Sequence, residues 1–396
     1  MKFTKELKNT LRYRRLFSVM LLGALTKYSI SYASTKPLEL KQQATVFFHI
    51  GVAMNQRQIT GVDSEGVKLI KANFSSITPE NALKWSELQP APGEYDFSLA
   101  DEYVNFGDKN GLFTIGHTLM WHNQTPPWIF QDSSGGEVSR EELLRRLRAH
   151  IATVVGRYKG RIKGWDVVNE ALNDENGQLR LEKPWYKILG EEGIFEAFKA
   201  AHEADPDAEL YYNDYSLHNP VKRAAAIRLF KRIRERGLRI DGIGTQEHHL
   251  LTQPSIDEID ATFSEFEKEG IPVMVTELDV SVLPRPKNYQ GAEISVSFKT
   301  SSELNPYVEG LPDSVSNALA ARYDAIFSVY LKYQKSIRRV ALWGATDGSS
   351  WLNHWPIRGR TDYPLLFDRN NLPKQAAFSV VDALKRAQSP ADPGKQ

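Results

Sequence analysis

Two glutamates, far apart in the chain, have the residue type and the position for acid–base chemistry on a sugar. Glu170 ends the short apolar run 162–170, and Glu277 lies near the end of a second run, 272–280, two residues before Asp279. If both runs are buried strands, the two glutamates can face each other across a groove. Glycoside hydrolysis needs such a pair, because one carboxyl group gives a proton to the leaving oxygen and the other stabilises or attacks the sugar cation.

The elements that must position this pair are indicated by short apolar runs that alternate with helix-like segments. The eight runs are 46–53, 72–78, 113–121, 162–170, 209–213, 240–246, 272–280 and 338–344. Most are continuously apolar rather than alternating, which is typical of parallel strands covered on both faces. The order of elements predicts an α/β protein, a single (β/α)8 TIM barrel. A doubly wound open sheet is the alternative, but no glycine-rich phosphate loop follows the first run.

The helices between these runs have their own start signals. Ser139 and Glu142 have the spacing of a capping box, and Ser255 and Glu258 repeat it. Active sites of barrels lie at the carboxyl ends of the strands. The fourth and seventh predicted strands would therefore present the two glutamates at the same end.

Polar and aromatic side chains also follow other predicted strands at this end. They stand in the segments 79–84, 116–122, 246–248 and 343–351. Trp, Asn, Gln, His and Lys bind sugars by stacking and by hydrogen bonds to hydroxyl groups. Each such residue alone is more often structural, as a Trp in the core or a Lys on the surface. Their convergence at one end of the predicted barrel favours a sugar-binding cleft.

The composition narrows the class of partner. The 396 residues are 41% hydrophobic and 25% charged, an ordinary globular composition, and the formal net charge is +1. No overall field therefore steers the protein to nucleic acid. The absence of cysteine excludes disulfides and thiolate chemistry. The neighbouring His248 and His249 do not predict a metal site, because adjacent strand residues point to opposite faces.

The first 33 residues predict a secretory signal peptide with cleavage near Ala33. Six basic residues precede the apolar run 16–25, which is shorter than the ~20 residues that span a bilayer. We expect export to the periplasm or the medium, with no membrane association once the signal is removed. A basic amphipathic extension that stays attached is the alternative. The rest divides into a polar lead-in, 34–44, a catalytic barrel, 45–387, and a flexible tail, 388–396.

Two segments at the ends of the fourth and seventh runs resemble signatures of a known family. WDVVNEAL at 165–172 and VTELDV at 275–280 resemble the family 10 glycoside hydrolases, the endo-β-1,4-xylanases. ENALKW, GHTLMWH, YYNDYS and TDGSSWL also occur in the order expected for that family. The resemblance runs from about Phe47 to Val381 and implies the (β/α)8 fold.

The resemblance implies catalytic roles for five residues. Glu170 would be the general acid/base and Glu277 the nucleophile. Asn169 would bond the 2-hydroxyl group of the sugar under attack. His248 would hold the Glu277 carboxylate, and Asp279 would orient that histidine.

The resemblance also implies contacts with sugars on both sides of the cleaved bond. On the glycone side the matching positions are Glu80, Asn81, Lys84, His117, Trp121 and Gln246. Trp343 and Trp351 would close over the sugar at the cleavage point, and Tyr215 would be an aromatic platform for the leaving group. Many members of the family have Asn directly after this Tyr, where this chain has Ser216. No cofactor and no metal are implied.

The implied reaction is internal cleavage of β-1,4-xylan by a retaining double displacement. The expected partners are xylan and xylo-oligosaccharides, bound by a monomer, and the long segment 283–307 is expected to wall the cleft. A β-1,4-glucanase or a glycanase of mixed specificity is the alternative enzyme. A non-catalytic polysaccharide-binding barrel is a further alternative, which the presence of both glutamates disfavours.

Overall fold

The structure is a computed structural model that describes residues 38–286, 289 and 294–389. The predicted signal peptide, 1–33, lies outside the described residues. Within the described part of the chain, no helix has the length and apolar character needed to cross a membrane.

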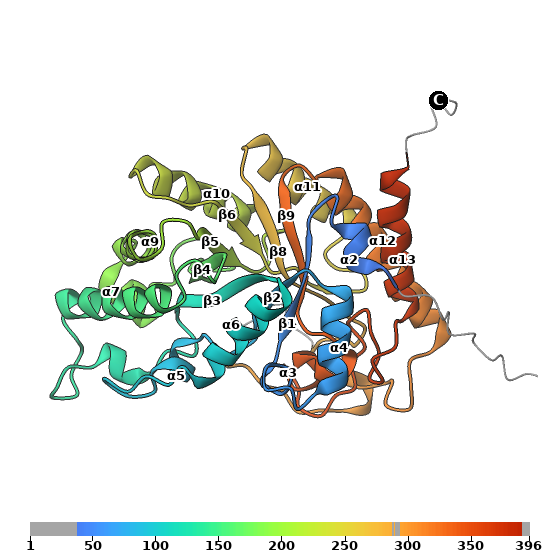
Figure 1. Cartoon of the computed structure of the whole chain (residues 1–396), viewed down its shortest axis with the longest axis horizontal. Coiled ribbons are helices and arrows are strands. Elements are labelled where there is room, and N and C mark those ends of the chain that lie inside the picture. Colours follow the sequence, from blue (N-terminus) through green and yellow to red (C-terminus); the bar gives the residue numbers. More distant parts are fainter. Residues whose placement is uncertain (1–37, 287–288, 290–293, 390–396) are drawn as a thin grey trace, which may run out of the picture. The chain divides into compact units, whose positions relative to one another are not determined.

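Eight parallel strands form a closed barrel at the centre of the fold (Figure 1). In chain order they are β1 (His49–Met54), β2 (Ser76–Pro79), β3 (Phe113–Trp121), β4 (Gly164–Asn169), β5 (Glu209–Asp214), β6 (Gly242–Thr245), β8 (Val273–Ser281) and β9 (Ile337–Leu342). Neighbours along the chain pair in parallel, β6 pairs with β8, and β9 returns to β1 to close the ring. The predicted single (β/α)8 barrel is confirmed.

The strand that carries Glu277 has an additional partner. The short strand β7 (His248–Leu250) pairs in parallel with the second half of β8, so that His248 lies opposite Asp279. Every residue of β4 and β8 is buried. The two strands expected to present the glutamates, β4 and β8, are therefore enclosed by the rest of the fold.

Helices cover the outside of the barrel, as Figure 1 shows. They are α2 (Leu40–Ala44), α3 (Gln56–Ile59), α4 (Ser64–Asn73), α5 (Trp85–Leu88), α6 (Ser98–Asn110), α7 (Arg140–Arg157), α8 (Pro184–Leu189), α9 (Glu192–Ala204), α10 (Pro220–Glu235), α11 (Ile256–Lys268), α12 (Asp313–Lys332) and α13 (Gln375–Gln388). Short 3₁₀ helices occur at η1 (Pro127–Phe130), η2 (Ser302–Leu304), η3 (Asp347–Ser349) and η4 (Trp351–Asn353). Ser139 caps α7 by accepting from the Glu142 amide, and Ser255 and Glu258 form a reciprocal capping box at α11.

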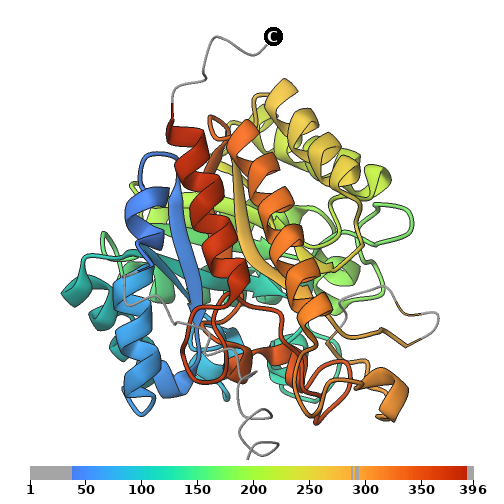
Figure 2. The ribbon, with the colours of Figure 1, turned by 90° about the vertical axis from the view of Figure 1, so that its right-hand side faces the viewer.

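The ordered fold begins inside the segment that the sequence assigned to a polar lead-in. Residues 40–44 form helix α2, in which Leu40 and Ala44 are fully buried. The side chain of Gln388, in α13, donates to the Gln43 carbonyl oxygen, so α2 packs beside α13. In Figure 2, α13 runs next to α12 along the barrel. Part of the lead-in thus belongs to the barrel's outer layer.

Candidate active site

A cleft of about 710 Å³ opens at the carboxyl ends of the strands. Most of the predicted site residues line it: Glu80, Asn81, Lys84, His117, Trp121, Asn169, Glu170, Gln246, His248, Glu277, Trp343 and Trp351. Residues 294–297 line it too, which agrees with the prediction that segment 283–307 walls the cleft. Of the predicted set, Asp279 and Tyr215 lie behind the wall.

Glu170 follows β4 directly and is turned into the cleft by a left-handed backbone conformation, with φ 56°. Its side chain is 5% exposed and accepts two hydrogen bonds, from Trp121 Nε1 at 2.8 Å and from Gln246 Nε2 at 2.9 Å. Burial raises the pKa of Glu170, and the charges of Asp214 and Glu277 act in the same direction. The carboxyl group therefore keeps its proton to a higher pH than an ordinary glutamate.

Glu277 lies within β8, is also 5% exposed and is held at both oxygens. Oε1 accepts from Asn213 Nδ2 at 2.8 Å, and Oε2 lies 3.2 Å from His248 Nε2. Burial acts to raise the pKa of Glu277. The hydrogen bond from His248, the charges of the neighbouring histidines and the hydrogen bond from Asn213 outweigh burial, so the pKa is lowered. The two glutamates are thus shifted in opposite directions.

His248 is held between two carboxylates. Its Nδ1 lies 3.0 Å from Asp279 Oδ2, and its Nε2 faces Glu277. Burial disfavours the charged imidazolium, but the charge and the hydrogen bond of Asp279, with those of Glu277, raise the pKa of His248 to about 10. At neutral pH both ring nitrogens therefore donate, and the imidazolium stabilises the ionised form of Glu277.

Three amides connect the two glutamates. Asn213 Nδ2 donates to Glu277 Oε1 and, at 2.8 Å, to Asn169 Oδ1. Asn169 Oδ1 also accepts from Gln246 Nε2 at 3.4 Å, and Gln246 bonds Glu170. The Asn169 oxygen is thus occupied, whereas its Nδ2 has no hydrogen-bond partner among the described residues and is a donor on the cleft wall.

Residues predicted to contact the glycone form a second polar group around a buried lysine. Lys84 Nζ donates to Asn81 Oδ1 at 3.0 Å and to Gln124 Oε1 at 2.7 Å, and lies 4.9 Å from the centre of the Trp121 ring. Burial lowers the pKa of Lys84, whereas the charges of Glu80, Glu277 and Glu170 oppose that shift. Burial likewise raises the pKa of Glu80. These groups offer donors and acceptors to sugar hydroxyls.

Aromatic rings form the opposite wall of the cleft. Trp343 meets the edges of His117 and His248, with ring centres 5.4 and 6.5 Å apart. Trp351 stacks on Trp355 at 4.5 Å and donates from Nε1 to Asp279. The tryptophans are therefore fixed in orientation by the same residues that hold the nucleophile candidate.

Tyr215, which the resemblance implies to be an aromatic platform for the leaving group, is buried. Its side chain is 2% exposed and lines neither the main cleft nor a second cleft of about 530 Å³ beside it. Lys222 Nζ covers its ring at 3.7 Å from the ring centre, and the residue packs in a small cluster with Leu352 and Trp355. Tertiary contacts from a helix and from the last barrel loop therefore bury this ring.

Three functional residues were not identified from the sequence. Asn213 is the last residue but one of β5, inside YYNDYS, so its place near the carboxyl end of the strand was a usable signal. Asp166, which lies 2.9 Å from His117 Nδ1, stands in the middle of a buried strand and has no marker in the sequence. Gln124 contacts Lys84 only because two separate loops meet.

Comparisons with known proteins agree with this site. The profile of Glycosyl hydrolase family 10 matches residues 39–383, a range that includes both glutamates. The Endo-1,4-beta-xylanase A of Xylanibacter ruminicola is 44% identical over 360 residues, which cover 91% of this chain and 97% of that protein. The Beta-1,4-xylanase of Dictyoglomus thermophilum is 40% identical over 371 residues, covering 92% and 98%.

Solved structures show the same similarity in three dimensions. A GH10 endoxylanase retrieved from a sugarcane soil metagenome superposes with a TM-score of 0.84 at 44% identity, covering 87% of this chain and 99% of that chain. A mutant structure in complex with xylotriose has a TM-score of 0.77 at 31% identity, covering 87% and 99%.

Proposed function

This chain belongs to glycosyl hydrolase family 10, and from that premise we propose that it hydrolyses internal β-1,4-xylosidic bonds of xylan with net retention. Glu170 is the general acid/base and Glu277 the nucleophile. The observation that carries the proposal is the opposite shift of two buried carboxyl groups in one cleft, with the pKa of Glu170 raised and the pKa of Glu277 lowered. Environments that push two pKa values apart mark the acid and its ionised partner.

In the first step the Glu277 carboxylate attacks the anomeric carbon. A bond forms between that carbon and a carboxylate oxygen, the glycosidic bond breaks, and its electron pair leaves with the departing oxygen. Glu170 gives its proton to that oxygen, so a sugar hydroxyl leaves instead of an alkoxide. His248 and Asn213 keep the attacking carboxylate ionised and oriented.

In the second step Glu170 changes role. Once Glu277 is esterified its negative charge is gone, so the proton affinity of Glu170 falls and the residue acts as a base. It takes a proton from water, the water oxygen bonds the anomeric carbon, and the ester bond to Glu277 breaks. Two inversions give net retention. Retaining enzymes place the two carboxyl groups about 5–5.5 Å apart; the amide chain through Gln246, Asn169 and Asn213 supports such proximity.

The choice of xylan rests on the fixed tryptophans and on the relatives. Xylose lacks the hydroxymethyl group of glucose, and that group would meet the rings of Trp343, which lies edge-on to His248, and Trp351, whose Nε1 donates to Asp279. The similar proteins from Xylanibacter ruminicola and Dictyoglomus thermophilum are named as xylanases. Xylan and xylo-oligosaccharides are therefore the substrates, and one chain supplies every residue of the site.

Product analysis tests this proposal directly. Proton NMR of fresh hydrolysate should show the β anomer first, and product sizing should show internal cuts in xylan with little release from carboxymethylcellulose. Appearance of the α anomer first would contradict the role of Glu277. Equal release from both polymers would replace xylan specificity with the mixed-specificity alternative.

The pH profile gives a second test. Because Glu277 must be ionised and Glu170 protonated, kcat/KM should rise through a pKa below the ordinary glutamate value and fall through one above it. His248→Gln removes the cation that lowers the pKa of Glu277, so the acid limb should move to higher pH. The alkaline limb should respond less, since burial is the main cause of the shift at Glu170. An unmoved acid limb would contradict the assigned role of His248.

We also propose that the protein is exported and acts as a monomer. The support is the pattern of residues 1–33 and the size of xylan, a polymer that must be cut outside the cell before its pieces can enter.

A further inference from the structure

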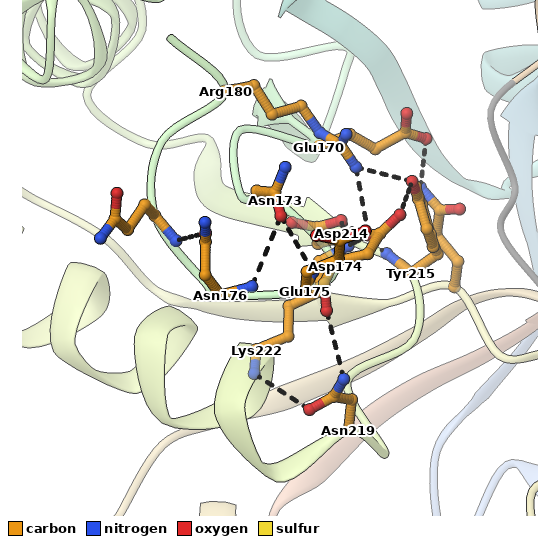
Figure 3. Close-up of polar contacts among 12 residues, drawn as sticks. Glu170, Asn173, Asp174, Glu175, Asn176, Arg180, Asp214, Tyr215, Asn219 and Lys222 are labelled. Carbon is orange, nitrogen blue, oxygen red and sulfur yellow. Dashed lines mark hydrogen bonds and ion pairs between the residues drawn. The ribbon is translucent and has the colours of Figure 1, made fainter.

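Beside the acid/base residue lies a group of polar and charged side chains that the reaction scheme does not use, all of them buried except Asp174, whose side chain is 38% exposed. We call it the Lys222 cluster; it consists of Asp174, Arg180, Asp214, Tyr215 and Lys222. Figure 3 shows these residues converging next to Glu170. Asp174 also lines the second cleft, together with Ser216 and His248. This cleft therefore adjoins the loops that follow β4 and β5.

The contacts within the cluster fix the Tyr215 phenol completely. Its hydroxyl accepts from Arg180 Nη2 at 2.6 Å and donates to Asp174 Oδ2 at 2.8 Å. Lys222 Nζ bonds Asp174 Oδ1 at 2.7 Å and Asp214 Oδ1 at 2.8 Å while lying over the Tyr215 ring. The backbone amide of Tyr215 donates to Asp214 Oδ1 at 2.9 Å. Hydroxyl, ring and backbone are therefore all held.

The charges of the cluster balance, with Arg180 and Lys222 against Asp174 and Asp214. The side chains of Lys222 and Asp214 have no exposed area, and that of Arg180 is 8% exposed. Buried ion pairs of this kind contribute little net stability, because desolvation offsets their attraction. In some proteins such pairs instead specify a single arrangement of the groups they join.

The cluster is connected to the acid/base residue by two routes. Asp174 and Arg180 belong to the segment 171–180, which directly follows Glu170 and its left-handed turn. The Asp214 carbonyl oxygen accepts from the Gln246 amide at 3.0 Å, and Gln246 bonds the Glu170 carboxyl group. A shift of the cluster would therefore move the backbone of Glu170 and would also move Gln246, which donates a hydrogen bond to the Glu170 carboxyl group.

We propose that Asp174, Arg180 and Lys222 are positioning residues that use the clamped Tyr215 phenol to fix the direction in which Glu170 presents its proton to the leaving oxygen. They do not touch the reacting atoms. This inference rests on the proposed function, because it assigns Glu170 the role of proton donor. It explains why a tyrosine that lines neither cleft is held by so many polar contacts.

The test removes the clamp while keeping the ring. Tyr215→Phe deletes only the hydroxyl group, and Arg180→Met deletes one of its partners. On xylotetraose, whose leaving group needs a proton, each variant should lower kcat/KM by about 10- to 100-fold, the range in which misplacement of a reacting group acts. On dinitrophenyl β-xylobioside, whose leaving group departs without a proton, the change should stay within about twofold.

The double variant and a matched control sharpen the result. Because Tyr215, Arg180 and Asp174 bond one another in a single network, Tyr215→Phe/Arg180→Met should lose hardly more than either single variant. Tyr158→Phe is the control, since it removes a hydroxyl that donates to Asp101 at 2.9 Å away from the site. Tyr158→Phe should leave kcat/KM on both substrates unchanged. Its effect on the melting temperature should be similar to that of Tyr215→Phe.

The outcomes separate the inference from the proposed function. An equal fall on both substrates, or no fall on either, overturns the positioning role. If the unmodified protein cleaves neither substrate, the proposed function itself fails. Selective loss on xylotetraose, with cooperative thermal unfolding retained, supports the inference.

Discussion

Replacing Glu277 with Ala should lower kcat/KM on xylan by more than about 10⁴-fold, equivalent to roughly 5.5 kcal/mol of transition-state stabilisation. The variant lacks the group that forms the covalent intermediate, so neither xylan nor an activated aryl xylobioside can be turned over. The melting temperature should stay within about 3 °C, because the loss of one buried carboxylate leaves His248 paired with Asp279.

Chemical rescue gives this prediction its sharpest form. Azide entering the space left by the shortened side chain should attack an activated β-xylobioside directly and give the α-xylobiosyl azide, by a single inversion. Glu277→Gln is the matched control, since it keeps the shape of the side chain and leaves no room for azide. Loss of cooperative folding in Glu277→Ala would instead indicate a structural role.

The second large effect is expected for Glu170→Ala. Xylan hydrolysis should fall by about 10²- to 10⁴-fold, the contribution typical of general acid–base catalysis. Dinitrophenyl β-xylobioside should still react in the first step, because its leaving group needs no proton, and should give a burst followed by slow turnover. The variant thus separates the two steps that Glu277→Ala abolishes together.

Rescue by azide should give the opposite stereochemistry in this variant. With Glu277 intact, azide replaces water in the second step and the product is the β-xylobiosyl azide. An α product would show that Glu277 is not the nucleophile. Parallel loss on xylan and on the activated substrate would contradict the assignment of Glu170 as proton donor. Taken with the α azide expected from Glu277→Ala, the pair of products assigns each carboxyl group without a structure of a complex.

The barrel was predictable where local sequence and burial agree. The strand β3 has the predicted bounds, 113–121, and all its residues after Phe113 are buried. The predicted run 72–78 included the end of α4, so β2 begins only at Ser76. The strand β7 has no apolar pattern of its own, and its two histidines become strand residues through pairing with β8.

The candidate site could be predicted as a set of positions but not as a set of contacts. The motifs placed Glu170 and Glu277 at one end of the barrel, which the structure shows. Lys222 stands in a helix rich in basic residues, where a lysine is ordinarily solvated, and only the approach of Asp174 and Asp214 buries it. The same approach covers Tyr215. The exposure of this residue therefore depends on contacts between separate segments and could not be predicted from any one of them.

At Glu170 the left-handed backbone conformation makes the residue type that is best for stability differ from the residue type that the reaction needs. A residue with a β-carbon is held there in a conformation that glycine adopts at no steric cost. Selection for heat resistance alone would favour glycine at this turn and discard the proton donor. Directed evolution of a more stable enzyme therefore has to gain stability at other positions in the barrel. The strained residue at the end of this strand, Glu170, must be kept for activity.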